Sequence, residues 1–315
     1  MLNKVIIIGA SIVDVIGMPL LPLKKGDSTP GKVLVSAGGV ARNIAENIQR
    51  IGINVTLISA IGNDLFGKVI VTNANELKIN INQSIIHNEK PTSFYLLITN
   101  DSGNPELAIS DTSIIEVISQ SFIELKRNLI EKHKIIVIDT NLPTETIYYL
   151  AESFNNQDIF IDLVSTTKAK KAKELIGKFH TIKPNIEEAE VLSDIKYNNE
   201  NDLLKMRDYF LHKGVKQLFI SMGEKGSFYA NSEIHGIISG RNVSIVNSSG
   251  AGDAYMAGLI YSYLKDKTIK ETACFASACS LIAMQKESAV NPQISLKLIV
   301  HMKLNQKILK LVPMF

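Results

Sequence analysis

The chain has 315 residues, of which 45% are hydrophobic and 21% are charged. This length and composition exclude a disordered chain, a collagen and a small disulfide-built protein, and they allow one large core or two modest ones. Lys and Arg number 34 against 31 Asp and Glu, a formal net charge of +3. We therefore do not expect the concentrated basic surface of a nucleic-acid-binding protein.

No segment of the sequence predicts insertion into a membrane or export. No apolar stretch reaches the ~18 residues that a membrane span needs. Met1 is followed almost at once by the apolar run Val5–Ile8, without the cleavage site of a signal peptide. Cys274 and Cys279 have a spacing that matches no metal or redox motif. These features favour a cytoplasmic protein in a reducing compartment.

From the N-terminus onward, short runs rich in β-branched residues alternate with helical patterns, which is typical of an α/β protein. Runs such as Ile135–Asp139 are apolar on both faces, as expected of parallel strands covered by helices on either side. The sequence thus predicts a doubly wound, mostly parallel sheet flanked by helices. The predicted strands are Val5–Ile8, Val55–Ser59, Ile135–Asp139, Ile159–Leu163, Thr181–Lys183 and Gln217–Ser221.

Two stretches, about 12–36 and 92–110, interrupt this pattern. Both alternate apolar and polar residues, as in Lys32–Ser36, and neither has a helical pattern between neighbouring runs. Alternation with a period of two predicts half-covered strands. We expect a small antiparallel sheet that projects from the core, with Asn100–Asn104 as the turn of a hairpin.

The segment Gly26–Val33 nearly spells a Walker A phosphate loop, but two features argue against that interpretation. Val33 stands where the loop needs a hydroxyl group for magnesium, and the residues that follow alternate like a strand instead of starting a helix. We therefore assign no phosphate site to this segment.

The C-terminal stretch Leu296–Val312 spaces apolar residues among lysines and contains no acidic residue. We expect a terminal helix packed on the domain or on a partner subunit. A basic amphipathic helix lying on a membrane is the alternative.

The segment Asn247–Leu259 predicts a site for a phosphate-sized anion. The small residues Gly250, Ala251 and Gly252 allow the backbone to approach a ligand closely, and a helical pattern begins near Asp253. Such a helix would direct free N–H groups and its positive end at the anion. Asp253 could accept a proton from an alcohol during phosphoryl transfer, or it could only balance the helix dipole.

Gly250–Asp253, together with Ser36–Ala45, resembles the two signature motifs of the ribokinase-like PfkB family of carbohydrate and nucleoside kinases. The resemblance covers nearly the whole chain. It implies one kinase domain over residues 1–315, with the doubly wound fold and a small β-sheet lid. It also implies ATP as co-substrate, Mg2+ as its metal, and Asp253 as the catalytic base beside the amides of residues 250–252.

Carried over by position, the resemblance implies that Gly38, Gly39 and Asn43 face the sugar, with the Asn amide bonding its hydroxyl groups. Asp14 matches the family carboxylate that binds a vicinal diol, and a carboxylate that accepts from two hydroxyl groups suits this role. Without the resemblance, the glycines could form a plain tight turn and Asp14 could serve as a turn or cap residue.

For the nucleotide end of the site, Asn185 and Glu188 match the family's Asn-x-x-Glu element, which is tied to magnesium and phosphate. They could act through water, because magnesium bound to ATP keeps several waters. Taken alone, the same residues predict a helix N-cap followed by an acidic first turn. Both interpretations can hold together.

The turn Ser221–Gly226 follows a predicted strand. By resemblance, Ser221, Gly223 and Gly226 lie beside the nucleotide phosphates, although glycines after a strand often only reverse the chain. Asn291 matches the family's adenine-side loop.

Three segments look most like those of pseudouridine kinases within the family, namely Glu106–Glu116, Asp139–Pro143 and Asp162–Lys170. Asn141 and Lys168 stand at ends of core strands, where α/β sheets present ligand groups, and are candidate substrate contacts. The implied reaction transfers the γ-phosphoryl group of ATP to the 5′-hydroxyl of pseudouridine.

Three alternatives remain open at this point. Another PfkB-type kinase, for ribose, adenosine or another nucleoside, would share every catalytic motif. A phosphosugar kinase would need basic groups for the second phosphate, for which Arg42 and Lys168 are candidates. A catalytically silent binding protein of the same fold would have no need of Asp253.

Two departures from the family pattern bear on cations and substrate. Asn247 replaces an aspartate often associated with a monovalent-cation site, which puts potassium activation in question, and Leu163 stands where the family more often has proline. Lid sheets of this family can pair between subunits, and an exposed sheet edge here has the same reason to pair. We expect a small acceptor and ATP as ligands, and a homodimer formed through the lid.

Overall fold

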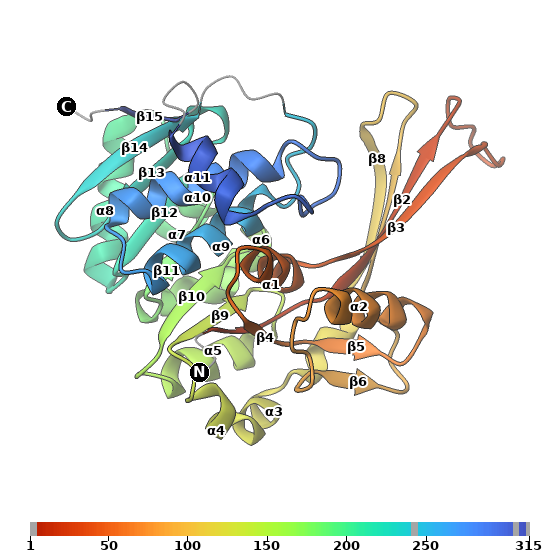
Figure 1. Cartoon of the computed structure of the whole chain (residues 1–315), viewed down its shortest axis with the longest axis horizontal. Helices are drawn as coiled ribbons and strands as arrows, with labels where there is room; N and C mark the ends of the chain where they lie inside the picture. The colour runs from red at the N-terminus through yellow and green to blue at the C-terminus, as the bar shows by residue number, and fades with distance from the viewer. Residues whose placement is uncertain (1–4, 241–244, 305–308, 313–315) are drawn as a thin grey trace.

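The computed structural model describes residues 5–240, 245–304 and 309–312. It has an α/β body from which a smaller sheet projects to one side (Figure 1). The strands are β1 (Val5–Ile8), β2 (Ile12–Pro19), β3 (Gly31–Gly38), β4 (Val55–Ile58), β5 (Ala60–Gly62), β6 (Ile85–His87), β7 (Phe94–Thr99), β8 (Pro105–Asp111), β9 (Ile135–Asp139), β10 (Asp158–Asp162), β11 (Thr181–Ile182), β12 (Gln217–Ser221), β13 (Ser227–Ala230), β14 (His235–Gly240) and β15 (Leu309–Val312).

Helices connect these strands. The α-helices are α1 (Val40–Arg50), α2 (Leu65–Glu76), α3 (Gln120–Leu125), α4 (Arg127–Ile130), α5 (Thr144–Ser153), α6 (Thr166–Ala169), α7 (Ile186–Ser193), α8 (Glu200–Lys213), α9 (Ala251–Leu264), α10 (Ile269–Ala283) and α11 (Leu296–Leu304). Short 3-10 segments lie at η1 (Ser113–Val117), η2 (Lys170–Lys178) and η3 (Gly223–Lys225).

The sheet of the body confirms the predicted architecture. Its strand order within the described residues is β15-β14-β13-β12-β11-β10-β9-β1-β4. The strands from β12 to β4 pair in parallel, whereas β13, β14 and β15 form an antiparallel edge. Each of the six strands predicted from the sequence coincides with one of these parallel strands to within one residue at either end.

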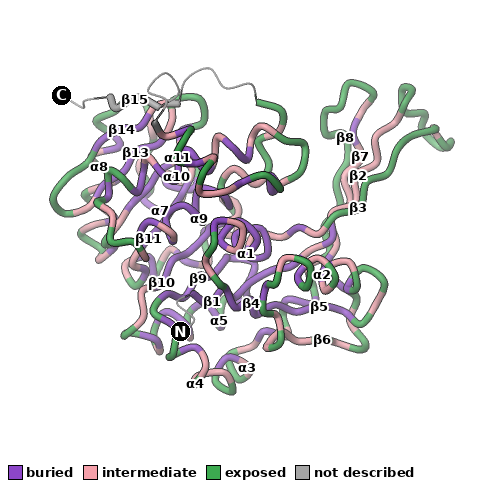
Figure 2. The backbone as a smooth tube through the Cα atoms, viewed as in Figure 1, coloured by how far each residue is buried: buried purple, intermediate pink, exposed green. Residues whose placement is uncertain are grey.

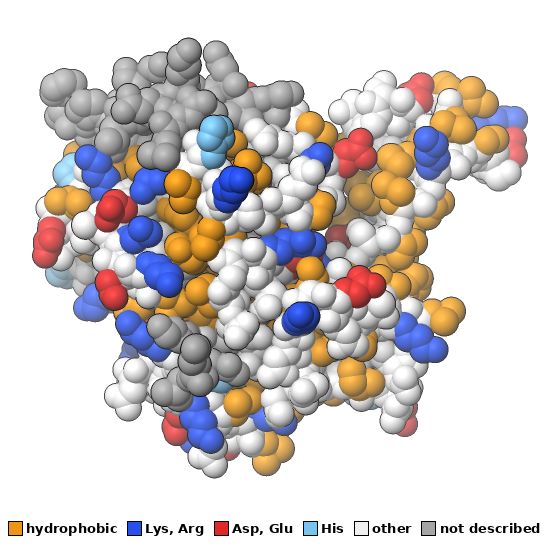
Figure 3. Space-filling model, in the orientation of Figure 1, with side chains coloured by type: hydrophobic (Ala, Val, Ile, Leu, Met, Phe, Trp, Pro, Cys, Tyr) orange, Lys and Arg blue, Asp and Glu red, His pale blue; other side chains and the backbone are white. Residues whose placement is uncertain are grey.

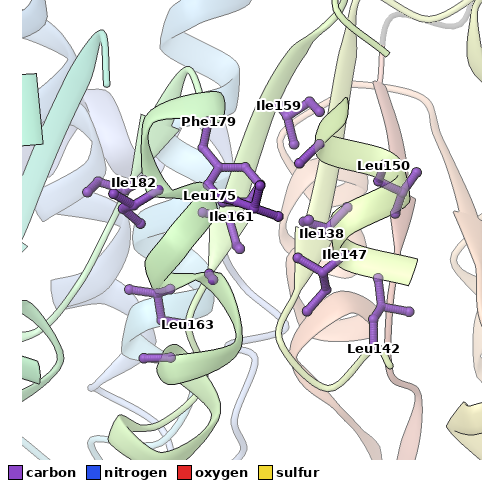
Figure 4. Close-up of a cluster of buried hydrophobic side chains, with 14 of the residues drawn as sticks. Ile138, Leu142, Ile147, Leu150, Ile159, Ile161, Leu163, Leu175, Phe179 and Ile182 are labelled. Carbon is purple, nitrogen blue, oxygen red and sulfur yellow. The ribbon is translucent and has the colours of Figure 1, made fainter. Parts of the chain in front are cut away.

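Both faces of the parallel strands are buried, as the apolar runs predict. Ile6 and Ile8 of β1 belong to an apolar cluster that includes side chains of α5 and α8, and Val5 and Ile7 belong to a second cluster that includes side chains of α1, α9 and α10. Figure 4 shows part of the first cluster, where side chains of β9 and β10 meet those of α5 and η2. This alternation fixes the strands between two helical layers.

The projecting sheet corrects one expectation, since it is mixed rather than antiparallel. Its order is β3-β2-β7-β8. The hairpin pairs β2–β3 and β7–β8 are antiparallel, but the central strands β2 and β7 run parallel. A long excursion through α1, β4 and α2 separates these two strands, so β7 enters the sheet from the same end as β2. The alternation of apolar and polar residues within a strand does not indicate which distant strand it pairs with, so the parallel pairing of β2 with β7 could not be predicted.

The same sheet, hereafter the lid, bears out two local expectations. Asn100 and Asn104 close the β7–β8 turn through a main-chain hydrogen bond of 2.8 Å. The residues after the false Walker A match form strand β3 and not a helix. Figure 2 shows that β3 and β8 are largely exposed, in contrast to the buried strands of the body.

The C-terminal stretch is a helix only in its first part. Helix α11 ends at Leu304, and Leu309–Val312 forms strand β15, which pairs antiparallel with β14. The expectation of one helix to Val312 was therefore wrong, because the edge strand β14 pairs with Leu309–Val312 instead. Residues 305–308 of the predicted helix lie outside the described residues. Among the described helices, none is long and apolar enough to cross a membrane.

Candidate active site

Polar residues gather at the carboxyl ends of neighbouring parallel strands. Asp139 and Asp162 are the last residues of β9 and β10, Lys183 follows β11, and Ser221 ends β12. Carboxyl ends of parallel strands meet at one edge of a sheet, where α/β proteins bind ligands. The sheet thus collects side chains that are distant in sequence.

Helix α9 starts above this edge with the small residues predicted for an anion site. Gly250 is its N-cap with φ of 74°, a left-handed conformation that favours glycine. A side chain at Gly250 would also overlap the carbonyl oxygen of Ala289. The N–H groups in the first turn of a helix have no acceptor within the helix. Here the N–H group of Ala251 donates to the carbonyl oxygen of Ser248 in the preceding loop, at 3.3 Å.

Asp253, in the first turn of α9, is buried and accepts a hydrogen bond of 2.8 Å from Nδ2 of Asn43. Burial raises the pKa of this carboxyl group to about 7, and the negative charge of Asp162 acts in the same direction. The hydrogen bond from Asn43 and the charge of Lys183 oppose the rise in pKa. A carboxyl group with a pKa near neutrality suits a general base.

Asn43 reaches Asp253 from helix α1, and Arg42 fixes the orientation of its amide. Nη2 of Arg42 donates to Oδ1 of Asn43 at 2.5 Å, so the NH2 end of the amide faces Asp253. Because arginine is only a donor, the reverse orientation would set two donors against each other. Nη1 of Arg42 donates to Glu46 and Asn73, at 2.5 and 2.8 Å.

Gly38, the first glycine of the pair ahead of α1, lies against Asp14 of β2. A side chain at Gly38 would overlap the Asp14 carboxylate, and Gly39, the N-cap of α1, has a φ of 94°. Burial raises the pKa of Asp14 to about 6, and the nearby charge of Arg42 opposes this rise. Arg42 thus lies near Asp14 and is hydrogen-bonded to Asn43, which in turn is hydrogen-bonded to Asp253.

Asn141 and Lys168 contact each other directly. Nζ of Lys168 donates to Oδ1 of Asn141 at 2.5 Å, while the main-chain amide of Asn141 donates to Asp139 at 2.9 Å. Burial lowers the pKa of Lys168. Among the described residues, Nδ2 of Asn141 has no hydrogen-bond partner although it is buried. The pair thus offers an unused donor beside the carboxyl end of β9.

A cavity of about 1050 Å³, hereafter the α9 cavity, borders the first turn of α9. The predicted residues that line it are Asn185, Ser221, Gly223, Gly226, Ala251 and Gly252. Asn291 is not among its lining residues. The side chain of Asn291 is buried, where it donates to Ile282 at 2.8 Å and accepts from Gln293 at 3.0 Å.

Asn185 and Glu188 form a reciprocal helix cap at the start of α7. Oδ1 of Asn185 accepts from the Glu188 amide at 2.7 Å, and Oε2 of Glu188 accepts from the Asn185 amide at 2.9 Å. Asn185 lines the α9 cavity, as does Glu187, while Glu188 lies behind them. The described residues hold no group of three or more His, Cys, Asp or Glu that could bind a metal alone. The oxygen donors present fit a magnesium ion that keeps phosphate and water ligands.

Lys183 and Asp162 also lie at this edge of the sheet, although no motif in the sequence singles them out. Nζ of Lys183 lies 3.3 Å from Oδ2 of Asp162, and both side chains are buried. Asp139 is another such residue, since it stands out in the sequence only as the start of the segment Asp139–Pro143. Its carboxylate accepts hydrogen bonds from the amides of Ala10 and Ala41, at 2.9 and 3.1 Å. The available signal was the position of each residue at a predicted strand end.

Comparison with known proteins agrees with this geometry. A model of the pfkB family of carbohydrate kinases matches residues 2–296. The chain belongs to the pfkB family. This PfkB kinase is 33% identical to pseudouridine kinase of Escherichia coli K12 over 295 residues, which covers 93% of this chain and 94% of that one. It is 30% identical to the uncharacterized sugar kinase YeiI of the same strain over 291 residues, covering 92% and 80%.

The fold of this PfkB kinase is ribokinase-like, as predicted. Arabidopsis thaliana ribokinase, solved in complex with ribose and ATP, matches it with a TM-score of 0.87 at 18% identity, covering 96% of this chain and 99% of that one. As a member of its family, the chain is a phosphotransferase that acts on an alcohol group of a sugar or nucleoside.

Proposed function

We propose that this PfkB kinase transfers the γ-phosphoryl group of ATP to the 5′-hydroxyl of pseudouridine, giving pseudouridine 5′-phosphate and ADP. The observation that carries the proposal is the position of Asp253. Its carboxylate accepts a hydrogen bond from Asn43 of α1, the helix that follows the glycine pair. Asp253 itself lies in the first turn of α9, which borders the α9 cavity. An acceptor on one side and a nucleotide on the other would therefore meet at this carboxylate.

Asp253 would act as the general base. It would take the proton of the acceptor hydroxyl while the oxygen forms its bond to the γ-phosphorus and the bond from that phosphorus to ADP breaks. The raised pKa of Asp253 makes the carboxylate a better proton acceptor at neutral pH. Burial from water favours attack by the acceptor over hydrolysis of ATP.

ATP would occupy the α9 cavity. Amides at Gly250, Ala251 and Gly252 would stabilise the charge that spreads over the transferring group. The turn of Ser221, Gly223 and Gly226 would lie along the other phosphates, and Asn291 would support the adenine-side loop from behind.

Magnesium would be held by the phosphates, with Asn185 and Glu188 acting on it through water. When bound, the metal would supply positive charge that offsets the charge developing on the leaving group. The cap between Asn185 and Glu188 fixes where both side chains point.

The acceptor would lie between Asp253 and the lid. Asp14 would accept hydrogen bonds from the ribose diol, while Gly38 and Gly39 would let the sugar approach the backbone. Asn141, with its unpaired Nδ2, and Lys168 would contact the base. Strands of the lid would exclude water when the site is filled.

The choice of pseudouridine rests on the 33% identity to a pseudouridine kinase and on the three similar segments. Another sugar or nucleoside acceptor is the second candidate, which the 30% identity to a sugar kinase favours. A phosphosugar acceptor is less well supported, because the guanidinium of Arg42 is already bonded to Glu46, Asn73 and Asn43. A catalytically silent binding protein would have no function for the buried carboxylate of Asp253.

We further propose that the lid mediates a homodimer. Its exposed hydrophobic side chains include Val33, Leu34, Val35, Leu107 and Ile109, and Figure 3 shows hydrophobic side chains along the projecting sheet. Pairing of two lids would cover these side chains and the strand edges. Sedimentation velocity would then give twice the mass of the chain.

The test of the acceptor is ADP release from magnesium ATP with pseudouridine, uridine, adenosine, ribose and fructose 6-phosphate. The highest kcat/KM with pseudouridine is expected. A higher value with another acceptor would keep the kinase assignment and reject pseudouridine. No turnover with any of them would bring the silent binding protein forward.

A further inference from the structure

Lys183 places a buried ammonium group in the wall of the α9 cavity. The residue is 7% exposed and follows the short strand β11. It lines the cavity together with Asn185, Ala251 and Gly252. A charged group that is removed from bulk water and yet borders a cavity is positioned to meet a ligand there.

The ammonium lies against the anion site of α9. A Cβ atom built on Gly252 would be 3.1 Å from Nζ of Lys183. Gly252 is the second residue of the helix, so the ammonium is adjacent to amides of the first turn. Lys183 also acts electrostatically on Asp253, the next residue of that turn. The cation and the positive end of the helix therefore face the same small volume.

Asp162 does not use up the hydrogen-bonding capacity of Lys183. Oδ2 of Asp162 is 3.3 Å from Nζ, but this buried oxygen has no hydrogen bond of acceptable geometry among the described residues. An ammonium has three donors. Asp162 thus supplies a counter-charge that keeps the ammonium in place without engaging all of its N–H groups.

Stability alone gives a poor reason for this ion pair. Burying two charges carries a large desolvation cost, and well-packed apolar residues in their place often stabilise a fold as well or better. A buried pair that opens onto an anion-sized site is better explained by a ligand that completes its hydrogen bonds.

We propose that Lys183 is a catalytic residue whose ammonium binds the γ-phosphoryl group of ATP during transfer, with Asp162 as the group that positions it. This inference rests on the proposed phosphoryl transfer. The bond from γ-phosphorus to ADP breaks as the bond to the acceptor oxygen forms, and the acceptor proton passes to Asp253. Lys183 stays protonated throughout, and its positive charge offsets the charge on the equatorial oxygens.

The test compares nucleotides that differ only at the γ position. Affinities for magnesium ADP and for a magnesium complex of a non-hydrolysable ATP analogue are measured by calorimetry in the wild type, Lys183→Met and Lys183→Arg. In Lys183→Met, the affinity for the ATP analogue should fall by about tenfold or more, while the affinity for ADP should change by less than about threefold. The kcat of this variant should fall by about 10²-fold. Lys183→Arg should restore part of the lost affinity, because it keeps the charge.

Lys173→Met is the matched control. Lys173 forms an ion pair with Asp194 at 2.7 Å, and Asp194 is exposed. Lys173→Met should leave kcat and the affinities for ADP and the ATP analogue unchanged. An equal loss of ADP and ATP-analogue affinity in Lys183→Met, or an unchanged kcat, would overturn the proposal and leave Lys183 with a structural role.

A lone Asp162 charge in Lys183→Met could prevent folding. The double variant Lys183→Met/Asp162→Asn removes both charges and is tested in the same way, with the same expected contrast between the two nucleotides. Failure of the proposed function is distinguishable, since a wild type that is inactive with every acceptor still reports whether Lys183 discriminates ATP from ADP.

Discussion

Nδ2 of Asn43 donates a hydrogen bond of 2.8 Å to Oδ2 of Asp253, joining two motifs that lie 210 residues apart in the sequence. Asn43 belongs to α1 and Asp253 to α9. Both helices cover the same face of the sheet, so their packing brings the acceptor motif to the base. The contact couples acceptor recognition to the carboxylate that would receive the proton.

The decrease of kcat/KM at acidic pH, the acid limb of the pH profile, should follow the protonation of Asp253. Its pKa is raised from 3.8 to about 7, and only the ionised carboxylate can accept a proton. Wild-type kcat/KM should therefore fall by about tenfold per pH unit below pH 7. The residual rate of Asp253→Asn should lack this limb, and this variant also corrects for titration of ATP itself. An identical acid limb in both proteins would contradict the assignment.

The same carboxyl group should make stability depend on pH. Between about pH 4 and pH 7 the folded protein keeps a proton on Asp253 that the unfolded chain has lost, so wild-type stability should decrease as pH rises through this window. Asp253→Asn removes this contribution. The Tm of the variant relative to the wild type should thus be higher at pH 8 than at pH 5. A Tm difference that is the same at both pH values would show that Asp253 is not protonated in the fold.

Asn43→Ala should raise the pKa of Asp253 further, because it removes the hydrogen bond that stabilises the carboxylate. We expect the acid limb to move to higher pH and kcat at pH 7 to fall by about 10- to 100-fold, the usual effect of a hydrogen bond to a charged group. Asn75→Ala, at an exposed position of α2, is the control. An acid limb that does not move would show that Asn43 does not act on the base.

Gly38→Ala should impair acceptor binding selectively. Its Cβ would overlap the Asp14 carboxylate, which would have to move away from the acceptor side. The KM for the acceptor should rise by about tenfold or more, with a smaller change for ATP, as for a misplaced binding group. Gly17→Ala, in the same lid sheet, meets its nearest atoms at 3.9 Å and should leave both KM values unchanged.

Asn247 should make the enzyme independent of potassium. Its Nδ2 donates to the carbonyl oxygen of Glu287 at 2.6 Å, and its Oδ1 accepts from the Ser249 amide at 2.9 Å. The first of these bonds joins the loop before α9 to the loop after α10, and the second holds the side chain of Asn247 within its own loop. Replacing K+ by choline at constant ionic strength should change kcat by less than about twofold, whereas Asn247→Asp would set a carboxylate against a carbonyl oxygen and gain cation dependence. Strong potassium activation of the wild type would refute this account.

Local patterns predict much of this fold. Both apolar faces of β9 and the period-two alternation of the lid strands are visible in the sequence, and so is the glycine-rich start of α9. The parallel pairing of β2 with β7 and the edge strand β15 are not, because each depends on a partner distant in the chain.

The site shows the same division. Motifs identify Asp253 and Asn43 through neighbours in the sequence. Lys183 and Asp162 meet only because β10 and β11 are adjacent in the sheet, and no spacing within either segment encodes that order. Likewise, the hydrogen bond from Arg42 of α1 to Asn73 of α2 appears only once the two helices are placed in space.

The central claim is that Asp253 is the base in phosphoryl transfer. The most direct test is single-turnover transfer from magnesium ATP to the preferred acceptor by the wild type and by Asp253→Asn, with both ligands' affinities measured by calorimetry. The account predicts that the transfer rate of the variant falls by about 10²- to 10⁴-fold while ATP and acceptor still bind. A transfer rate equal to that of the wild type would contradict it.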